Sequence, residues 1–315
     1  MNFQQLRIIR ETVRCGFNLT DVATALFTSQ PGVSKHIRDL EDELGLEIFV
    51  RKGKRLTGLT DPGKELLVLV EKMLADARNI KSLADQFSNR DVGQLTVVTT
   101  HTQARYSLPQ VVNQFRKKYP KVHLRLHQGS PREIIQMLKE GTADIGIATE
   151  LLSEESELVS FPYYEWQHVV IAHKDHPLAD RTKLSIAELV EYPLITYQEG
   201  FTGRMKIDQL FKKYGLLPDV AISALDADVI KTYVELELGV GVIASMAFDA
   251  QKDFDLRTLE ISEDLPLNVT SIAVRRGHYL RSFAHEFIAL CNPELSERHV
   301  KERLQNDDTQ NLDQV

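Results

Sequence analysis

The stretch from Asn18 to Phe49 reads "NLTDVATALFTSQPGVSKHIRDLEDELGLEIF" and holds two short helical patterns. We expect Thr20 to cap the first helix, whose apolar face would end with Leu26 and Phe27. Pro31 suits the first turn of a second helix, and Gly45 suits its end. Apolar residues recur every three or four positions between these two points. Two short helices with a tight connection predict a helix-turn-helix motif.

The polar face of the second helix carries groups that can contact base edges and phosphates in a major groove. A run of four basic residues in five positions follows, and the flanking segments predict a small β-hairpin wing that would touch the DNA backbone. Residues 1–59 are therefore predicted to form an N-terminal all-α winged helix-turn-helix domain that binds double-stranded DNA. The candidate DNA-binding residues are Ser29, Gln30, Pro31, Ser34, Lys35, Arg38, Arg51, Lys52, Lys54 and Arg55.

A long helix is predicted over residues 60–90. Thr60-Asp61-Pro62 is a helix-start signal, and apolar residues then alternate at spacings of four and three. Such a seam indicates packing along another helix, and a partner chain is the economical solution. Packing against the C-terminal part of the same chain is the alternative. The candidate dimerisation residues are Leu66, Val70, Met73, Ala77 and Ile80.

From Leu95 onward, strand and helix patterns alternate, which predicts two α/β lobes built on largely parallel sheets. We assign residues 91–165 plus 266–292 to lobe I and residues 166–265 to lobe II. This arrangement resembles the bilobed periplasmic solute-binding proteins. The polar segment 293–315 shows no apolar period and is expected to be partly disordered.

Hydroxyl and amide groups follow several of the predicted strands, where parallel sheets place their ligands. Helix starts at these points favour an anion, to which neutral hydroxyls add donors. The alternative is that each residue only caps a helix. The sole tryptophan, near the predicted crossover between lobes, could pack in the core or line the cleft. The candidate effector-binding residues are Thr100, Thr102, Gln103, Ser130, Thr149, Trp166 and Thr202.

Other functional classes find little support in the sequence. The net charge of −7 excludes a generally basic protein. The two cysteines lie far apart in the sequence, which argues against a disulfide framework. Segment 239–244, "GVGVIA", leads from a helix into a strand, which is the wrong context for dinucleotide binding. Asp228 is expected to cap the helix that follows it. We therefore predict no enzyme activity, no cofactor and no metal site. The absence of a signal peptide and of an apolar span predicts a cytoplasmic protein without membrane contact.

The order of these parts resembles the LysR-type transcriptional regulators, and "TSQPGVSKHIRDLEDELGLEIFVR" matches that family's DNA-binding signature. The motifs "TTHTQARY", "HQGSP", "DIGIATE" and "GFTGR" resemble a branch of the family that controls sulfate assimilation and cysteine synthesis. The resemblance implies an activator that binds promoter DNA, works with RNA polymerase and forms a homotetramer of two dimers. It also implies that the cleft residues bind O-acetylserine, N-acetylserine, sulfate or thiosulfate. A sulfonate or sulfate-starvation regulator of the same family remains an alternative, and a solute-binding protein a remote one.

Overall fold

The computed structural model describes residues 1–88, 90–149, 151–181 and 183–305. The chain divides into two compact units, Met1–Asp85 and Gln86–Val315. Within the described residues, no helix is both long enough and apolar enough to span a membrane.

The N-terminal unit begins with three helices, α1 (Phe3–Arg14), α2 (Leu19–Ala25) and α3 (Gln30–Leu44), which enclose a common apolar core. The predicted cap of α2 is wrong by two residues: Asn18 is the cap, and its side chain accepts a hydrogen bond from the Thr20 N–H at 3.0 Å. The expected apolar role of Phe27 is also wrong. This residue lies beyond the end of α2 at a φ of 51° and its side chain is 98% exposed. The positive φ turns the chain toward α3 and directs the ring into solvent.

Helix α3 and the wing are joined by one buried carboxylate. Ser29 caps α3, and Gly45 ends it in the left-handed conformation, as predicted. Strands β1 (Phe49–Lys52) and β2 (Arg55–Leu59) form the expected antiparallel hairpin. Glu41 of α3 accepts a hydrogen bond from the Ile48 N–H at 2.9 Å and pairs with Arg51 at 2.5 Å. The carboxylate thus fixes the wing against the helix that would enter the groove.

Helix α4 (Asp61–Ser88) starts where the sequence predicts, with Thr60 Oγ1 accepting the Gly63 N–H at 3.0 Å. Its apolar seam is divided between two environments. Leu66 and Val70 pack with Leu6 and Leu74 of the same unit, and Val70 is only 1% exposed. The assignment of Val70 to a partner-facing seam is therefore corrected: α1 already covers it. Ala77 is partly buried, whereas Met73 and Ile80 are exposed and remain available to a partner helix.

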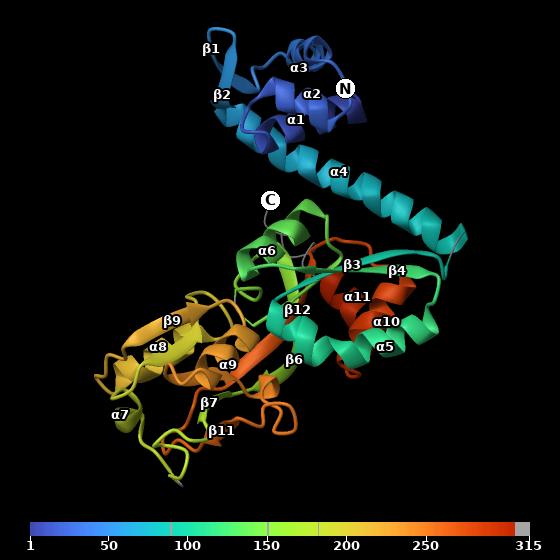
Figure 1. Cartoon of the computed structure of the whole chain (residues 1–315). Coiled ribbons are helices and arrows are strands. Elements are labelled where there is room, and N and C mark those ends of the chain that lie inside the picture. The colour runs from blue at the N-terminus through green and yellow to red at the C-terminus, as the bar shows by residue number, and fades with distance from the viewer. Residues whose placement is uncertain (89, 150, 182, 306–315) are drawn as a thin grey trace. The chain divides into compact units, whose positions relative to one another are not determined.

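Lobe I of the second unit contains a five-stranded sheet in the order β4-β3-β5-β12-β6. Its strands are β3 (Gly93–Thr99), β4 (Val122–Gln128), β5 (Ile145–Ala148), β6 (Leu158–Trp166) and β12 (Asn268–Arg275). Strand β3 pairs in parallel with β4 and β5, whereas β12 pairs antiparallel with β5 and β6. Figure 1 shows α5 (Leu108–Lys118) and α10 (Ser282–Cys291) side by side. They bury the larger core of this lobe, and α6 (Pro131–Glu140) packs into the other.

Lobe II contains a second five-stranded sheet in the order β11-β7-β10-β8-β9. Its strands are β7 (His168–His173), β8 (Leu194–Tyr197), β9 (Val220–Ala224), β10 (Val240–Ala244) and β11 (Leu256–Leu259). Helices α7 (Ile186–Leu189) and α8 (Arg204–Lys213) share one core cluster with the sheet, and α9 (Ala227–Glu235) shares another. A short 3-10 turn, Ser245–Ala247, follows β10. Residue 167 and residues 260–267 connect the two sheets.

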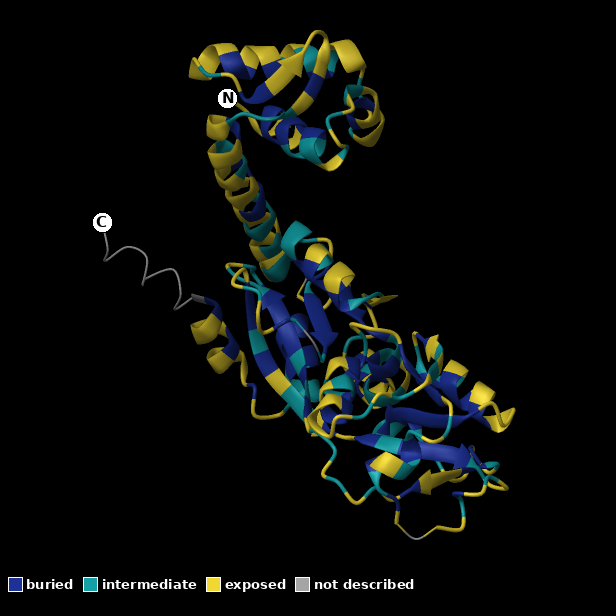
Figure 2. Ribbon diagram, turned by 90° about the vertical axis from the view of Figure 1, so that its left-hand side faces the viewer, coloured by how far each residue is buried: buried dark blue, intermediate teal, exposed yellow. Residues whose placement is uncertain are grey.

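The C-terminal segment, which was expected to be partly disordered, begins with a helix: α11 covers Glu297–Gln305. Leu295, Val300 and Leu304 are at most 6% exposed and belong to the lobe I core. Val300 and Leu304, four residues apart on an otherwise polar helix, pack α11 on the lobe together with Leu295, which precedes it. Figure 2 shows the buried strands of this core in dark blue. Residues 306–315 lie outside the described residues.

Candidate effector cleft and nucleic-acid interface

The candidate DNA contacts lie on one helix and one hairpin of the N-terminal unit. Gln30, Pro31, Lys35 and Arg38 of α3 are exposed, and Ser34 is partly buried and accepts from the Gln30 amide at 3.1 Å. Ser29 is exposed, but its hydroxyl caps α3 by accepting from the Gly32 N–H at 3.2 Å. The wing side chains Arg51, Lys52, Lys54 and Arg55 are also exposed. Exposed donors at a helix start beside a basic hairpin suit a major groove and its flanking phosphates.

The stretch between β3 and α5 carries the first group of predicted effector residues. Gln103–Ser107 form a π-helix, a form that often marks a functional site. Thr100, Thr102 and Gln103 are 5%, 1% and 0% exposed. Thr102 Oγ1 is buried and meets no partner with good hydrogen-bond geometry among the described residues, although the Tyr197 hydroxyl lies close enough to interact with it. A buried unpaired hydroxyl costs free energy, so this atom is a candidate for a ligand contact.

Three of the predicted residues converge on Thr270 of β12, which is fully buried. Its hydroxyl accepts from Gln103 Nε2 at 3.2 Å and from Trp166 Nε1 at 3.0 Å. It also bonds the Thr149 hydroxyl at 3.3 Å. The sequence left open whether Trp166 packs in the core or lines the cleft. Its burial and its hydrogen bond to Thr270 show that the indole is part of the core beneath the cleft.

Gln103 is more completely engaged by protein than the sequence predicts. Its carbonyl oxygen accepts from the hydroxyls of Tyr164 and Ser107, and its amide donates to Thr270. Only the second N–H of the amide is left for a ligand. The role of Gln103 in this structure is chiefly to connect the π-helix with β6 and β12.

The lobe II part of the site is the turn before α8. Thr202 is 3% exposed and has a φ of 45°, in the left-handed region that β-branched residues rarely adopt. Its carbonyl accepts from His168 Nε2 at 2.8 Å. His168 Nδ1 lies 3.3 Å from the side-chain nitrogen of Asn268. Helix α8 then starts at Arg204, with Gly203 as its N-cap and without a side-chain cap. The Arg204 N–H donates to the Phe201 carbonyl at 2.9 Å, which ties the turn to the first turn of the helix.

A groove runs between the two lobes. One section of about 390 Å³ is lined by Thr149 and Asn268 on one side and by Gly203 and Lys206 on the other. A second section of about 690 Å³ is lined by Ser130 and Arg132 of lobe I and by residues 198–201 of lobe II. Leu151 and Met205 border both sections, which makes them one continuous cleft.

Ser130 borders the cleft, yet its hydroxyl is used by its own helix. It accepts from the Glu133 N–H at 3.3 Å, and the Glu133 carboxylate accepts from the Ser130 N–H at 2.7 Å. These two bonds are a capping box. For this residue, helix capping accounts for the serine that the sequence placed among the cleft candidates.

Two guanidinium groups near the cleft are bound to protein atoms, whereas the exposed Arg132 lines the cleft itself. Arg105 Nε lies 2.7 Å from an Asp228 oxygen. Arg204 is 8% exposed, pairs with Asp208 at 2.7 Å and donates to the Tyr197 carbonyl at 2.6 Å. Lys206, which the sequence reasoning missed, lines the cleft and donates to the Leu267 carbonyl. The buried end of the site therefore offers neutral donors, with positive charge at its border.

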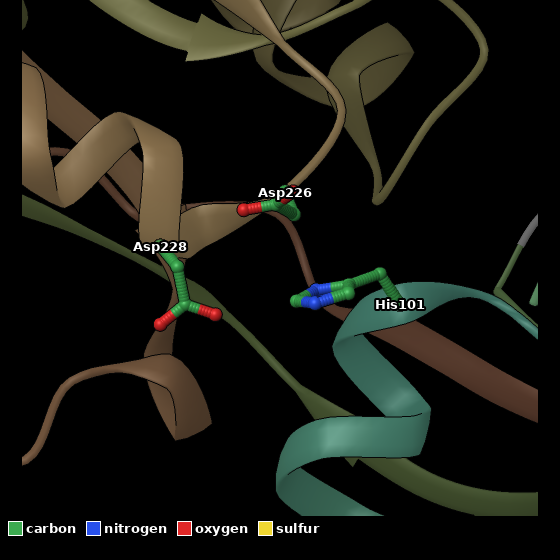
Figure 3. A group of neighbouring side chains, drawn as sticks. All are labelled: His101, Asp226 and Asp228. Carbon is green, nitrogen blue, oxygen red and sulfur yellow. The ribbon is translucent and has the colours of Figure 1, made fainter.

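His101, Asp226 and Asp228 bring one side chain of lobe I and two of lobe II within 4.8 Å of one another, as Figure 3 shows. Asp228 does not cap α9, contrary to expectation; Asp226 does, by accepting from the Val229 N–H at 3.0 Å. Asp228 instead accepts from the Tyr106 hydroxyl at 2.8 Å and pairs with Arg105. Because its carboxylate is occupied by these donors, we interpret the group as a contact between lobes.

Sequence reasoning missed five residues at this site: Tyr164, His168, Lys206, Asn268 and Thr270. Asn268 and Thr270 lie at the start of a strand pattern, "NVTSIAVRRG", whereas ligand signals were sought after the strands. One available signal was the strand period, since Asn268 and Thr270 fall on the same face as Ile272 and Val274.

Comparison with known proteins agrees with both halves of the chain. Residues 3–64 match the family model described as bacterial regulatory helix-turn-helix protein, lysR family. Residues 88–296 match the model of the LysR substrate binding domain. The two matches correspond to the helix-turn-helix with its wing and to the bilobed α/β unit.

Among the regulators that are similar over nearly the whole chain are the following three. The transcriptional regulator SsuR of Burkholderia cenocepacia is 53% identical over 95% of this chain and 97% of its own. The regulator cbl of Escherichia coli is 49% identical, with 99% of both chains covered. CysB of B. cenocepacia is 47% identical, with 98% of both covered.

Two solved structures are similar to this chain. The crystal structure of the cofactor-binding domain of Cbl superimposes with a TM-score of 0.65 at 44% identity, covering 68% of this chain and 93% of that one. A full-length OxyR variant from Pseudomonas aeruginosa, with a TM-score of 0.67, 22% identity and 94% of both chains covered, shares the fold.

Proposed function

The chain belongs to the LysR family of DNA-binding transcriptional regulators, which are not enzymes, and we propose that it activates genes of sulfate assimilation and cysteine synthesis in response to a small sulfur-pathway anion. The proposed effector is O-acetylserine, N-acetylserine, sulfate or thiosulfate, bound between the lobes. Similarity to CysB supports the regulon. The exposed contacts on α3 and the wing would bind promoter DNA, and the exposed seam residues of α4 would join chains in a homotetramer that contacts RNA polymerase.

The observation that carries the effector proposal is the unpaired hydroxyl of Thr102 beside the Thr270 network. A carboxylate or sulfate oxygen would accept a hydrogen bond from that hydroxyl. The turn at Thr202 and the start of α8 would meet the anion from lobe II, where the helix dipole favours negative charge. Arg105 and Arg204 are each paired with an aspartate, so recognition at the buried end of the site rests on neutral donors and on the helix start, while Arg132 and Lys206 supply positive charge at its border.

Calorimetric titration of the full-length protein with sulfate and with each acetylserine tests this proposal. A hydrogen bond to a charged group is worth roughly 1.5–3 kcal/mol, so Thr102→Ala should weaken binding about tenfold or more. Thr202→Ala should do likewise from lobe II. Thr142→Ala is the matched control, because Thr142 is exposed at the far end of α6 and bonds the Met137 carbonyl. Wild-type affinity in Thr102→Ala would contradict the proposal.

A second candidate is a regulator of the same family that responds to sulfonate supply or sulfate starvation. It is favoured by identities to SsuR and cbl of 53% and 49%, against 47% to CysB. Titration with an alkanesulfonate and with sulfate alone distinguishes the two. Release of promoter DNA by sulfate without any response to acetylserines would favour the second candidate.

A further inference from the structure

The turn that carries Thr202 is held in an uncommon backbone conformation. Gly200, Thr202 and Gly203 have φ values of 80°, 45° and 72°. Glycine adopts this region readily, whereas a β-branched residue does so only where its surroundings enforce it. The contacts of Thr202 should therefore reveal what enforces the conformation.

Those contacts come from the segments that connect the lobes. His168 is the first residue of β7, directly after the first crossover, and Asn268 is the first residue of β12, directly after the second. His168 Nε2 lies 2.8 Å from the Thr202 carbonyl oxygen. A Cβ on Gly203 would lie 2.5 Å from Asn268 Oδ1 and 2.7 Å from His168 Cε1. The turn therefore packs closely against the first residue after each crossover, His168 and Asn268.

The orientation of the His168 ring is fixed on every side. The side chain is 2% exposed, and the ring packs edge-on against Trp166 at 4.9 Å between centroids. Its Nδ1 faces the Asn268 amide nitrogen, which can only donate. Nδ1 must then accept, so Nε2 carries the hydrogen and donates to Thr202. Burial lowers the pKa of His168 to about 4, which keeps the ring neutral and able to accept at Nδ1 while donating at Nε2.

We propose that His168 is the positioning residue of the effector site: its Nε2–H holds the Thr202 carbonyl, and through it fixes the direction of the Thr202 hydroxyl and of the α8 N-terminus. Asn268 selects the tautomer that makes this possible. The inference rests on the proposed function, because it assigns a role to a residue behind the same cleft. It places the support of the lobe II turn at the crossovers, where the lobes would move relative to each other.

Matched substitutions test the donor. In His168→Gln the amide nitrogen reaches the position of Nε2 and can still donate to Thr202. In His168→Asn it reaches only the position of Nδ1, and His168→Leu has no donor. With sulfate and N-acetylserine as separate probes in calorimetry, His168→Gln should stay within about threefold of wild type. The Asn and Leu variants should bind about tenfold more weakly, the loss expected for one misplaced hydrogen bond to a charged ligand.

A double-mutant cycle separates positioning from general destabilisation. Thr202→Ala keeps the backbone carbonyl that His168 holds, so the cycle isolates the part of the effect that passes through the Thr202 hydroxyl: His168→Leu should weaken binding less in the Thr202→Ala background than in the wild-type background. His285→Leu is the control for loss of a buried histidine, since His285 is 3% exposed in α10 of lobe I. It should bind both probes like wild type.

The outcomes distinguish the two proposals. Wild-type affinity in Thr202→Ala would overturn the lobe II part of the effector site, and this inference with it. Weakened effector binding by Thr202→Ala, together with wild-type binding by His168→Leu, would overturn only the positioning role of His168. If the Leu variant does not fold, the Gln and Asn pair decides: equal affinities of these two variants contradict the role of the Nε2 donor.

Discussion

Replacing Thr270 with valine removes a hydroxyl whose bonding capacity is fully used. A threonine hydroxyl has one hydrogen and two acceptor sites. Gln103 and Trp166 donate to Thr270 Oγ1 at 3.2 and 3.0 Å, which occupies both acceptor sites. Its own hydrogen must therefore go to the Thr149 hydroxyl, 3.3 Å away. Valine has nearly the same shape and offers none of these contacts, so the packing is kept while two buried N–H groups lose their acceptor.

The size of the effect follows from those two donors. Each orphaned buried donor costs about 1–3 kcal/mol, so the two together cost about 2–6 kcal/mol, and burial of the added methyl group returns about 0.8 kcal/mol. The net loss should be about 1–5 kcal/mol. In a unit of this size each kcal/mol lowers the midpoint by about 2–4 °C, so Thr270→Val should melt roughly 2–20 °C below wild type.

The sole tryptophan makes the assay direct, because Trp166 is the side chain that loses its acceptor. Thermal unfolding of the full chain, followed by intrinsic fluorescence, reports the lobe that contains the network. Thr270→Ser keeps the hydroxyl and controls for loss of the methyl group; it should melt well above the valine variant. Equal midpoints for the serine and valine variants would show that the hydroxyl network does not stabilise the lobe, and would refute the reasoning.

Three other predictions concern the rest of the chain. Lys54→Ala should weaken DNA binding about equally across sequences and lower the salt slope by about one unit, as measured by fluorescence anisotropy at several salt concentrations. Met73→Asp should dissociate the dimer in sedimentation while the N-terminal unit stays folded, whereas Val70→Asp should unfold that unit, because Val70 is 1% exposed within it. Burial lowers the pKa of both His168 and His285 to about 4, against about 6.5 in an unfolded chain. Their contribution to the free energy of unfolding is fully present above pH 6.5 and is lost as the pH falls toward 4, by about 1.4 kcal/mol per pH unit for each histidine. Replacing either with leucine should therefore reduce the slope of the free energy of unfolding against pH between these values, as measured by denaturant unfolding at several pH values.

Local signals account for what the sequence could predict. Caps, a proline in a first turn, an αL glycine and apolar spacings place α3, the wing and α4 within a few residues, since each depends on neighbours along the chain. Alternating strands and helices likewise predict the two sheets, but the expectation of largely parallel sheets is wrong: β12 pairs antiparallel with β5 and β6, and β7 pairs antiparallel with β10 and β11. Errors occur where two neighbouring residues are equally suitable helix N-caps. Asn18 and Thr20 both suit the start of α2, and Asp226 and Asp228 both suit the start of α9.

The interior of the site could not be predicted because its contacts are remote in sequence. Thr270 bonds residues 104 and 167 positions away. His168 and Asn268 meet across 100 residues. Nothing near "NVTSIAVRRG" specifies which side chains will surround it. The same limit explains Val70: the heptad pattern identifies an apolar stripe on α4, but only the fold of the unit shows that α1 covers part of it.

The burial of the effector residues has a consequence for how a ligand would enter. Thr102 and Thr202 are 1% and 3% exposed, so an anion that bonds both can reach them only when the lobes separate. Separation would pull the π-helix from α9 and break the bonds of Asp228 to Tyr106 and Arg105. A ligand that contacts both lobes binds their closed arrangement better and shifts the population toward it. Since Thr102 directly precedes the π-helix that carries Arg105 and Tyr106, its effector contact and the contact between lobes would form and break together.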